Sequence, residues 1–350
     1  HLALLRVRRK FLQMTNESEN PPEGVPARQR PPLWQIILPW LITAACFAYL
    51  YTRLDSAAAR DGQTLVMYLA EIFAKVNWGL WLALMIPYSA FYFLIDSAVV
   101  WAVINWYNTK VRYRDILPIR GSSYILSILN EQVGKGAMGV YLYRRDHVPG
   151  WEVGSSMLFI MFCEFYYLLI WATVGYIIAG DRLPEEFGLI PYIAILAGVF
   201  FTGFHLFITA KTGSEKSWRE RPVFHAFRNA KLTHYGTMVV LRSPALLAAV
   251  VIYTLALRLF GVSVEFTTML GYLPIIFFGA ATPGPMRSVA ITLWVVLFPG
   301  HEGQMTTFGF VQHNFFIFFN AAIGLLFLRR ARRDLFGTQE ASAEATPSNP

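Results

Sequence analysis

The chain has 350 residues, of which 55% are hydrophobic, 16% are aromatic and only 15% are charged, and its net charge is +8. A soluble domain usually has about 25% charged residues, so the composition excludes an ordinary soluble protein. The basic residues are scattered over several segments, which argues against nucleic acid as a partner. Cys46 and Cys163 both lie in apolar runs and indicate neither a disulfide framework nor a metal site.

The chain begins with a basic, proline-rich stretch, residues 1–32, which we interpret as a cytoplasmic arm. Six apolar runs then approach the ~20 residues that a helix needs to cross a bilayer. These predicted spans are Leu33–Thr52, Trp78–Tyr107, Trp151–Gly180, Phe187–Ala210, Gly236–Phe260 and Gln304–Leu328. Between the first two, residues 55–76 have apolar side chains at helical spacing, which is typical of an interfacial helix or of a helix that docks a partner. Residues 331–350 are polar and small, and we expect a disordered cytoplasmic tail.

The distribution of Lys and Arg predicts the orientation of these spans. Basic residues concentrate near both termini and in residues 108–150 and 211–235. The segments on the opposite side have few, namely Arg53, Arg60, Lys75, Arg182 and Arg258. Because cytoplasmic segments of membrane proteins carry an excess of Lys and Arg, we predict that both termini are cytoplasmic.

Two further apolar stretches are interrupted by a Gly/Pro-rich break that carries a cation. Residues 122–143 contain the break GKGAMG with Lys135, and residues 266–299 contain the break ATPGPMR, which ends at Arg287. The charge distribution places both ends of the first stretch inside and both ends of the second outside. We therefore predict an all-α polytopic membrane protein with about six spans and two re-entrant helical hairpins of opposite orientation. The alternative is that residues 266–299 form two ordinary spans in a different topology.

The breaks are candidate binding sites because irregular backbone cannot face lipid. Unpaired N–H and C=O groups cost several kcal/mol each in hydrocarbon, so both breaks should be covered or should line a wet cavity. In the second break, Pro283 and Gly284 precede a helix start, whose free N–H groups and positive dipole end suit a phosphate or carboxylate beside Arg287. The alternative for Arg287 is an interfacial arginine that reaches lipid headgroups. Lys135 in the first break has the same two interpretations.

Ionisable residues within the predicted spans are expensive and are functional candidates by default, and we single out Glu164, Asp96 and Arg242. Glu164 has no opposite charge three or four residues away, so it should be neutral or paired with a distant cation such as Lys135, Arg242 or Arg287. Asp96 follows a strongly apolar run and is assigned to the same network. Arg242 precedes a proline and either kinks its helix or reaches the cytoplasmic headgroups.

Motifs for soluble catalysis are absent from the sequence. It has no Gly-x-Ser-x-Gly elbow, P-loop, dinucleotide-binding glycine fingerprint or His-Glu-x-x-His. It also lacks a pair of Asp-rich motifs that would hold a divalent metal for lipid-headgroup transfer. We therefore expect no enzyme activity, no cofactor and no metal, and an intramembrane lipid transferase is the weakest alternative.

The block from Ser123 to Leu169 resembles the first signature of the lysylphosphatidylglycerol-synthase transmembrane-domain family, the flippase-like integral membrane proteins. The corresponding features are a helix end with an Asn, the Gly-rich break, a basic pair and a later Glu, here Asn130 and Glu131, GKGAMG, Arg144-Arg145, and Glu164. ATPGPMR and the last helix with its late Gly324 look like the family's second signature. The resemblance covers about residues 33–330 and marks the chain as a divergent member, since Phe165 stands where the family has an arginine and Arg287 lies near a family glutamate.

The resemblance implies a membrane-embedded cavity, bound phospholipid, and lipid translocation or processing in the bacterial inner membrane. We therefore expect a protein that binds or translocates lipids with an anionic or polyprenyl headgroup. Because the family's polar hallmarks are altered, the alternative is a non-catalytic structural or assembly subunit of a larger membrane complex. The candidate binding residues are Asp96, Asn130, Glu131, Lys135, Glu164, Arg242, Pro283, Gly284 and Arg287.

Overall fold

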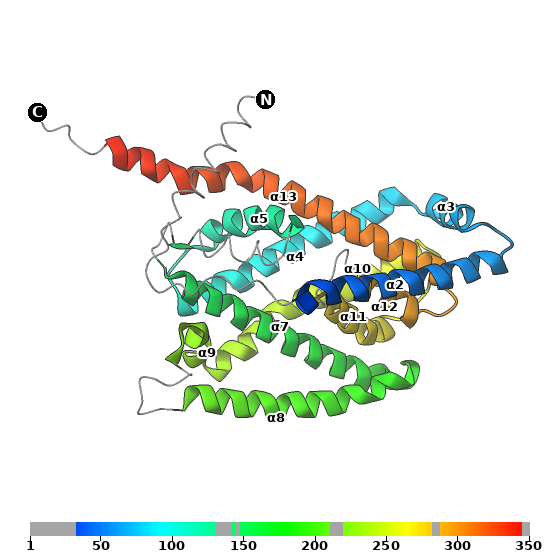
Figure 1. Cartoon of the computed structure of the whole chain (residues 1–350), viewed down its shortest axis with the longest axis horizontal. Coiled ribbons are helices and arrows are strands. Elements are labelled where there is room, and N and C mark those ends of the chain that lie inside the picture. The colour runs from blue at the N-terminus through cyan, green and yellow to red at the C-terminus, as the bar shows by residue number, and fades with distance from the viewer. Residues whose placement is uncertain (1–32, 130–141, 144–147, 211–219, 282–287, 345–350) are drawn as a thin grey trace, which may run out of the picture. The chain divides into compact units, whose positions relative to one another are not determined.

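The computed structural model describes residues 33–129, 142–143, 148–210, 220–281 and 288–344. The chain divides into two units, residues 1–41 and residues 42–350. The described part of the first unit is the start of helix α2, Leu33–Arg60. The second unit is built from helices, with no strand among its described residues (Figure 1). The predicted arm, residues 1–32, lies outside the described residues.

Five of the described helices are long and apolar enough to cross a membrane. They are α4 (Trp78–Tyr107), α7 (Gly150–Ala179), α8 (Ile190–Thr209), α10 (Leu232–Arg258) and α13 (Glu302–Glu344). Each of these helices contains one of the predicted spans or has bounds within a few residues of it. The chain is therefore an all-α, multi-pass membrane protein, as its composition predicted. The remaining predicted span, Leu33–Thr52, forms the first part of α2, and its crossing of the membrane stays a prediction.

The segment predicted as one interfacial helix, residues 55–76, is divided between two helices. Its first residues continue α2, and the chain then turns at Gly62, whose φ of 66° is a backbone conformation that favours glycine. Thr64 next caps helix α3 (Leu65–Lys75), because its side chain accepts a hydrogen bond from the Met67 N–H. The apolar periodicity of the sequence therefore predicted helix α3, and the turn at Gly62 separates this helix from α2.

Helix α3 is held against the start of α13. Gly303 leaves room there for the side chains of Tyr68 and Ile72. Beside this contact, an ion pair of 3.2 Å joins Arg60 at the end of α2 to the buried Glu302 in the first turn of α13. An acidic side chain is also favourable at a helix start.

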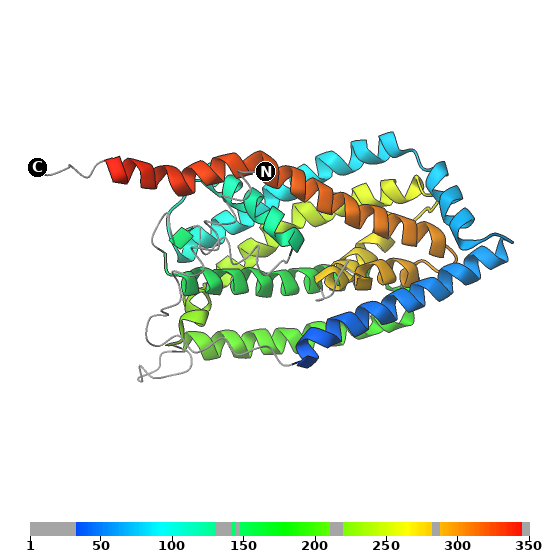
Figure 2. The same ribbon diagram turned by 45° about the horizontal axis from the view of Figure 1, so that its top comes forward.

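Two shorter apolar helices, α11 (Phe266–Ala281) and α12 (Ser288–Leu297), flank the second predicted break. They pack against each other, and α11 also packs against α7 and α10 (Figure 2). Helix α5 (Tyr113–Leu129) contains the first part of the predicted hairpin 122–143 but begins earlier than predicted. It runs along α13 (Figures 1 and 2). The first break and residues 282–287 of the second break lie outside the described residues.

Helix α13 also extends further than its predicted span. Its helical backbone continues to Glu344, through most of the segment 331–350 for which the sequence predicted disorder. The residues there include many of high helix propensity, such as Arg, Ala, Gln and Glu. The polar composition of this segment therefore did not distinguish a helical extension of α13 from a disordered tail.

Aromatic packing holds the second unit together. One buried cluster lies among α4, α7 and α10 to α13, where the rings of Trp81, Tyr253, Trp294 and Phe308 are almost fully buried. Edge-to-face contacts such as Tyr253–Phe308, with ring centroids 6.0 Å apart, are a favourable geometry for such pairs. This cluster surrounds the site described below.

Glycine permits a close crossing of α7 and α11. A Cβ atom added at Gly175 would lie 2.5 Å from the Cα of Gly271, so the two backbones approach each other without a side chain between them. Small residues at helix crossings are the usual way for membrane helices to pack closely. The crossing therefore fixes α11, one wall of the site, to a long spanning helix.

We predict that Gly175→Ala lowers the free energy of unfolding by about 1–3 kcal/mol, because an extra methyl group must push the two helices apart. The matched control is Gly154→Ala on the same helix, where an added Cβ would meet nothing within 4 Å. That variant should be neutral or more stable by roughly 0.5–1 kcal/mol, since alanine is the better helix former. Denaturant unfolding in detergent measures both, and equal stability of the two variants would contradict the crossing.

Candidate functional site

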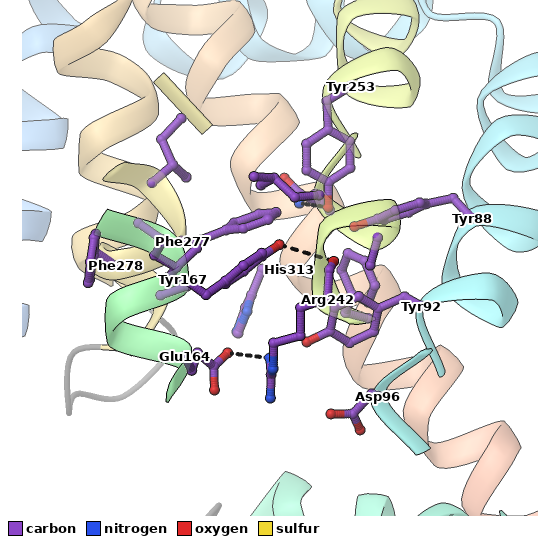
Figure 3. Close-up of a pocket in the computed structure, with 18 of the residues that line it drawn as sticks. Tyr88, Tyr92, Asp96, Glu164, Tyr167, Arg242, Tyr253, Phe277, Phe278 and His313 are labelled. Atoms are coloured by element: carbon purple, nitrogen blue, oxygen red, sulfur yellow. Dashed lines mark hydrogen bonds and ion pairs between the residues drawn. The ribbon is translucent and has the colours of Figure 1, made fainter. Parts of the chain in front are cut away.

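A cavity of about 480 Å³ lies among α4, α7, α10, α11, α12 and α13 (Figure 3). This volume is within the range of roughly 300–1,000 Å³ that is typical of small-molecule sites. Many of its lining residues are aromatic, among them Tyr88, Tyr92, Tyr167, Tyr253, Phe277 and Phe278. Three of the predicted site residues, Asp96, Glu164 and Arg242, supply charged side chains to the same wall.

Glu164 of α7 and Arg242 of α10 form an ion pair in the wall of the cavity. Arg242 Nη1 lies 3.2 Å from Glu164 Oε1. The two partners differ in exposure, because 9% of the Arg242 side chain is accessible against 40% of the Glu164 side chain. Of the two possibilities predicted for Glu164, the structure shows pairing with a distant cation, and that cation is Arg242, one of the three candidates.

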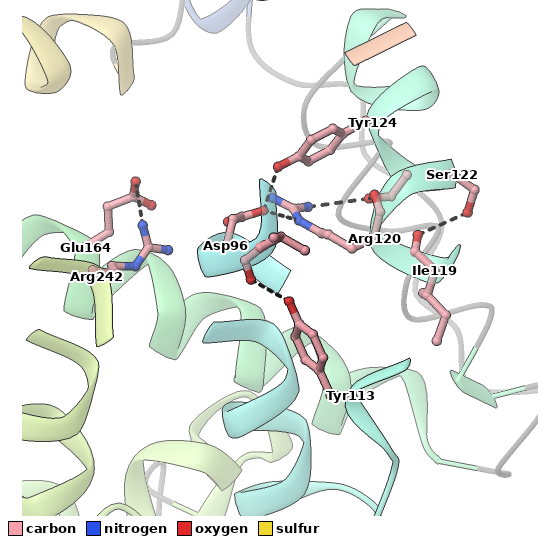
Figure 4. Close-up of polar contacts among 10 residues, drawn as sticks. Asp96, Tyr113, Ile119, Arg120, Ser122, Tyr124, Glu164 and Arg242 are labelled. Atoms are coloured by element: carbon pink, nitrogen blue, oxygen red, sulfur yellow. Dashed lines mark hydrogen bonds and ion pairs between the residues drawn. The ribbon is translucent and has the colours of Figure 1, made fainter. Parts of the chain in front are cut away.

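Asp96 of α4 has a different cation as its partner. Arg120 Nε of α5 donates to Asp96 Oδ2 at 2.6 Å, and the Tyr124 hydroxyl donates to the same oxygen at 2.8 Å (Figure 4). The Arg120 guanidinium also lies over the Tyr124 ring, 4.9 Å from its centroid. Both side chains of this pair are largely buried, with 16% of Arg120 and 8% of Asp96 accessible.

The two ion pairs form one row of alternating charges. Figures 3 and 4 show Arg242 between the carboxylates of Glu164 and Asp96, and Figure 4 shows Arg120 beyond Asp96. Arg242 interacts electrostatically with both carboxylates. The order is therefore Glu164, Arg242, Asp96 and Arg120, and each charge comes from a different helix. Alternation keeps each buried charge beside an opposite one, which offsets the cost of removing it from water.

Hydrogen bonds from α7 hold α10 where Arg242 enters the cavity. Pro244 has no N–H to donate within α10, so the helical bonding is interrupted next to Arg242. The Tyr167 hydroxyl donates to the Arg242 carbonyl at 3.3 Å, and Trp171 Nε1 donates to Ser243 Oγ at 2.9 Å. The proline that the sequence linked to a kink thus lies in a segment that is tied to the neighbouring span.

One donor of Arg242 is left over. Its Nε is buried and has no hydrogen-bond partner among the described residues. A buried guanidinium N–H without an acceptor is costly, and an arginine presents its donors in a planar fork that matches phosphate and carboxylate groups. Arg242 thus lines the cavity with a guanidinium that is incompletely paired, beside a carboxylate that is still partly accessible.

The sequence named nine site residues, and the structure brings three of them together. Asp96, Glu164 and Arg242 line one cavity and belong to one charge row. The remaining six lie outside the described residues and stay predictions, namely Asn130, Glu131, Lys135, Pro283, Gly284 and Arg287. His313 and Asn320 of α13 also reach this cavity.

Sequence reasoning missed Arg120 and Tyr124. Arg120 was counted with the basic cytoplasmic stretch, because a count by segment does not tell which arginine is buried. The available signal was its position between the apolar residues ILPI and the small residues GSS. The buried Ile116 and Ile119 confirm that this part of α5 packs against other helices.

Comparison of the chain with protein-family models, with curated proteins and with solved structures found no match. The function is therefore argued from the charge row and the cavity.

We predict that Arg120→Met lowers the free energy of unfolding by about 3–5 kcal/mol, because it leaves Asp96 buried without its cation. Adding Asp96→Asn should restore much of the loss, since the charge that lacked a partner is then removed. Arg114→Met, at an exposed position on the same helix, is the control and should change stability by only about 0.5 kcal/mol. Unfolding in detergent measures all three, and a similar effect of Arg120→Met and Arg114→Met would show that the pair is not needed.

Proposed function

We propose that this protein binds membrane lipids by a phosphate-bearing headgroup in the cavity and moves them between the leaflets. The observation that carries the proposal is Arg242, a largely buried guanidinium whose Nε has no acceptor among the described residues, in a cavity large enough for a headgroup. The phosphate of a phospholipid or of a polyprenyl lipid would supply that acceptor. Bound phospholipid is then the natural occupant of the cavity.

The position of Arg242 along its helix suits such a role. At ~1.5 Å per residue it lies roughly 15 Å along α10 from Leu232. In a hydrocarbon core ~30 Å thick, that is a depth at which a headgroup could be held between the two leaflets. Substrate sites of transporters commonly lie near the bilayer midplane and are lined by interrupted helices.

We infer that α11 and α12 are the two arms of a re-entrant hairpin. Their 16 and 10 residues correspond to roughly 24 and 15 Å, each less than the ~30 Å of the hydrocarbon core. They pack against each other, as hairpin arms do, and both contribute residues to the cavity. In the same proposal α5 is the first arm of the hairpin 122–143, which enters from the cytoplasmic side. The chain then has about six spans with both termini in the cytoplasm.

The resemblance to the flippase-like lysylphosphatidylglycerol-synthase transmembrane-domain family supports the same function and the bacterial inner membrane as its location. The alternative remains a non-catalytic subunit of a membrane complex. It is favoured by α3, which exposes Val66, Met67 and Phe73 on the side away from α13. A stoichiometric protein partner after purification in mild detergent, lost in a Val66→Ser/Met67→Ser variant, would favour the subunit.

We predict that the full-length protein, reconstituted in vesicles, moves fluorescent phospholipids between the leaflets and that Arg242→Gln slows this by about tenfold or more. The loss corresponds to a charge-assisted hydrogen bond of roughly 1.5–3 kcal/mol. Bleaching of the outer-leaflet label with dithionite measures the rate.

Two further variants separate function from folding. Arg258→Gln removes an exposed arginine from the other end of the same helix and should keep the wild-type rate. Arg242→Gln/Glu164→Gln removes both charges of the pair, so it should unfold at nearly the wild-type temperature and still translocate slowly. Wild-type rates in the Arg242→Gln variant would overturn the proposed role of Arg242.

A further inference from the structure

Among the described residues, three charged side chains line the cavity: Asp96, Glu164 and Arg242. Asp96 is already engaged by Arg120 and Tyr124, which leaves Arg242 and Glu164 as the charged pair that faces the cavity. Arg242 Nη1 is 3.2 Å from Glu164 Oε1, and Glu164 is the more accessible partner. The Glu164–Arg242 pair has no net charge.

A headgroup with only a negative charge is poorly matched to this pair. If its phosphate took Arg242 from Glu164, it would leave the carboxylate without a cation in a low-dielectric site, and an unpaired charge there is expensive. A headgroup with both a phosphate and an ammonium avoids this cost. Its phosphate can pair with Arg242 while its ammonium pairs with Glu164, so one ion pair is exchanged for two.

Aromatic rings lie on the side of Arg242 where the ammonium would be held. Phe165 follows Glu164 on α7, and its ring centroid is 5.4 Å from that of Phe278 on α11. Figure 3 shows Phe277 and Phe278 on the Glu164 side of Arg242, with Asp96 on the other side. Ammonium and quaternary ammonium groups are attracted to aromatic ring faces, and aromatic cages bind choline in this way.

We propose that the cavity selects phospholipids with a zwitterionic headgroup, a phosphate joined to a primary or quaternary ammonium, with Arg242 on the phosphate and Glu164 on the ammonium. This inference rests on the proposed function and narrows it. Glu164 determines the selectivity, and Arg242 is needed for every headgroup that contains a phosphate.

The test uses acyl-labelled phospholipids that differ only in the headgroup, namely phosphatidylethanolamine, phosphatidylcholine and phosphatidylglycerol. They are translocated by the full-length protein in vesicles of one fixed composition, so that the surface potential is the same. The wild type should move the two zwitterionic lipids about tenfold faster than phosphatidylglycerol, which corresponds to about 1.4 kcal/mol. Glu164→Gln should invert this order, because the cavity then has a net positive charge.

Two control variants test whether the headgroup preference depends specifically on the Glu164 carboxylate. Glu265→Gln removes an exposed carboxylate that is also paired with an arginine, Arg182, and should keep the wild-type order. Glu164→Asp keeps the carboxylate and should still prefer the zwitterionic lipids. An inversion in Glu164→Gln but not in Glu164→Asp would therefore be due to loss of the carboxylate charge and not to a substitution at this position as such.

The outcomes distinguish the two proposals. Translocation that depends on Arg242 but is fastest for phosphatidylglycerol would overturn the headgroup assignment and leave the proposed function standing. A preference for zwitterionic lipids that Glu164→Gln does not alter would overturn the role of Glu164. No translocation of any of the three lipids would overturn the proposed function itself.

Discussion

The structure depends on the alternation of charge along Glu164, Arg242, Asp96 and Arg120. An ionised side chain in an apolar interior is tolerated only beside an opposite charge or good hydrogen-bond partners. Here each of four helices, α7, α10, α4 and α5, contributes one member of the row, so these charges restrict how the four helices can pack. The aromatic cluster around Tyr253 and Trp294 supplies packing energy, whereas the charge row favours one arrangement over others that bury the same apolar area.

The two ion pairs have different consequences because they differ in burial. The Asp96–Arg120 pair is largely closed, has an added hydrogen bond from Tyr124, and joins α5 to a spanning helix. The Glu164–Arg242 pair faces the cavity through a carboxylate that is 40% accessible, and Arg242 keeps one donor without an acceptor. A pair of the first kind stabilises the fold, whereas a pair of the second kind can exchange its partner for a ligand. In our proposal, that exchange is the binding step for a lipid headgroup.

Hydrophobicity predicted the long helices α4, α7, α8, α10 and α13 from the sequence, because a run of apolar residues reports directly on burial in lipid. The absence of a neighbouring opposite charge also indicated that Glu164 is either neutral or paired with a distant cation. It did not identify which cation, because that depends on how α7 and α10 pack. Arg120 was hidden for the same reason, since its segment resembles other basic segments and only its contact with Asp96 distinguishes it. The anionic-headgroup site expected at Lys135 and Arg287 lies outside the described residues and stays a prediction. In the cavity that the structure describes, our proposal is based on Arg242 and its paired carboxylate, Glu164.

The most direct test of this account is an experimental density map of the protein in a bilayer of zwitterionic phospholipid. The account predicts a headgroup in the cavity, with a phosphate oxygen about 3 Å from a nitrogen of the Arg242 guanidinium and the ammonium beside Glu164, while Asp96 and Arg120 keep their own contact. A map in which Arg242 Nε is bonded to a side chain of the protein and the cavity holds only acyl chains, or nothing, would contradict it.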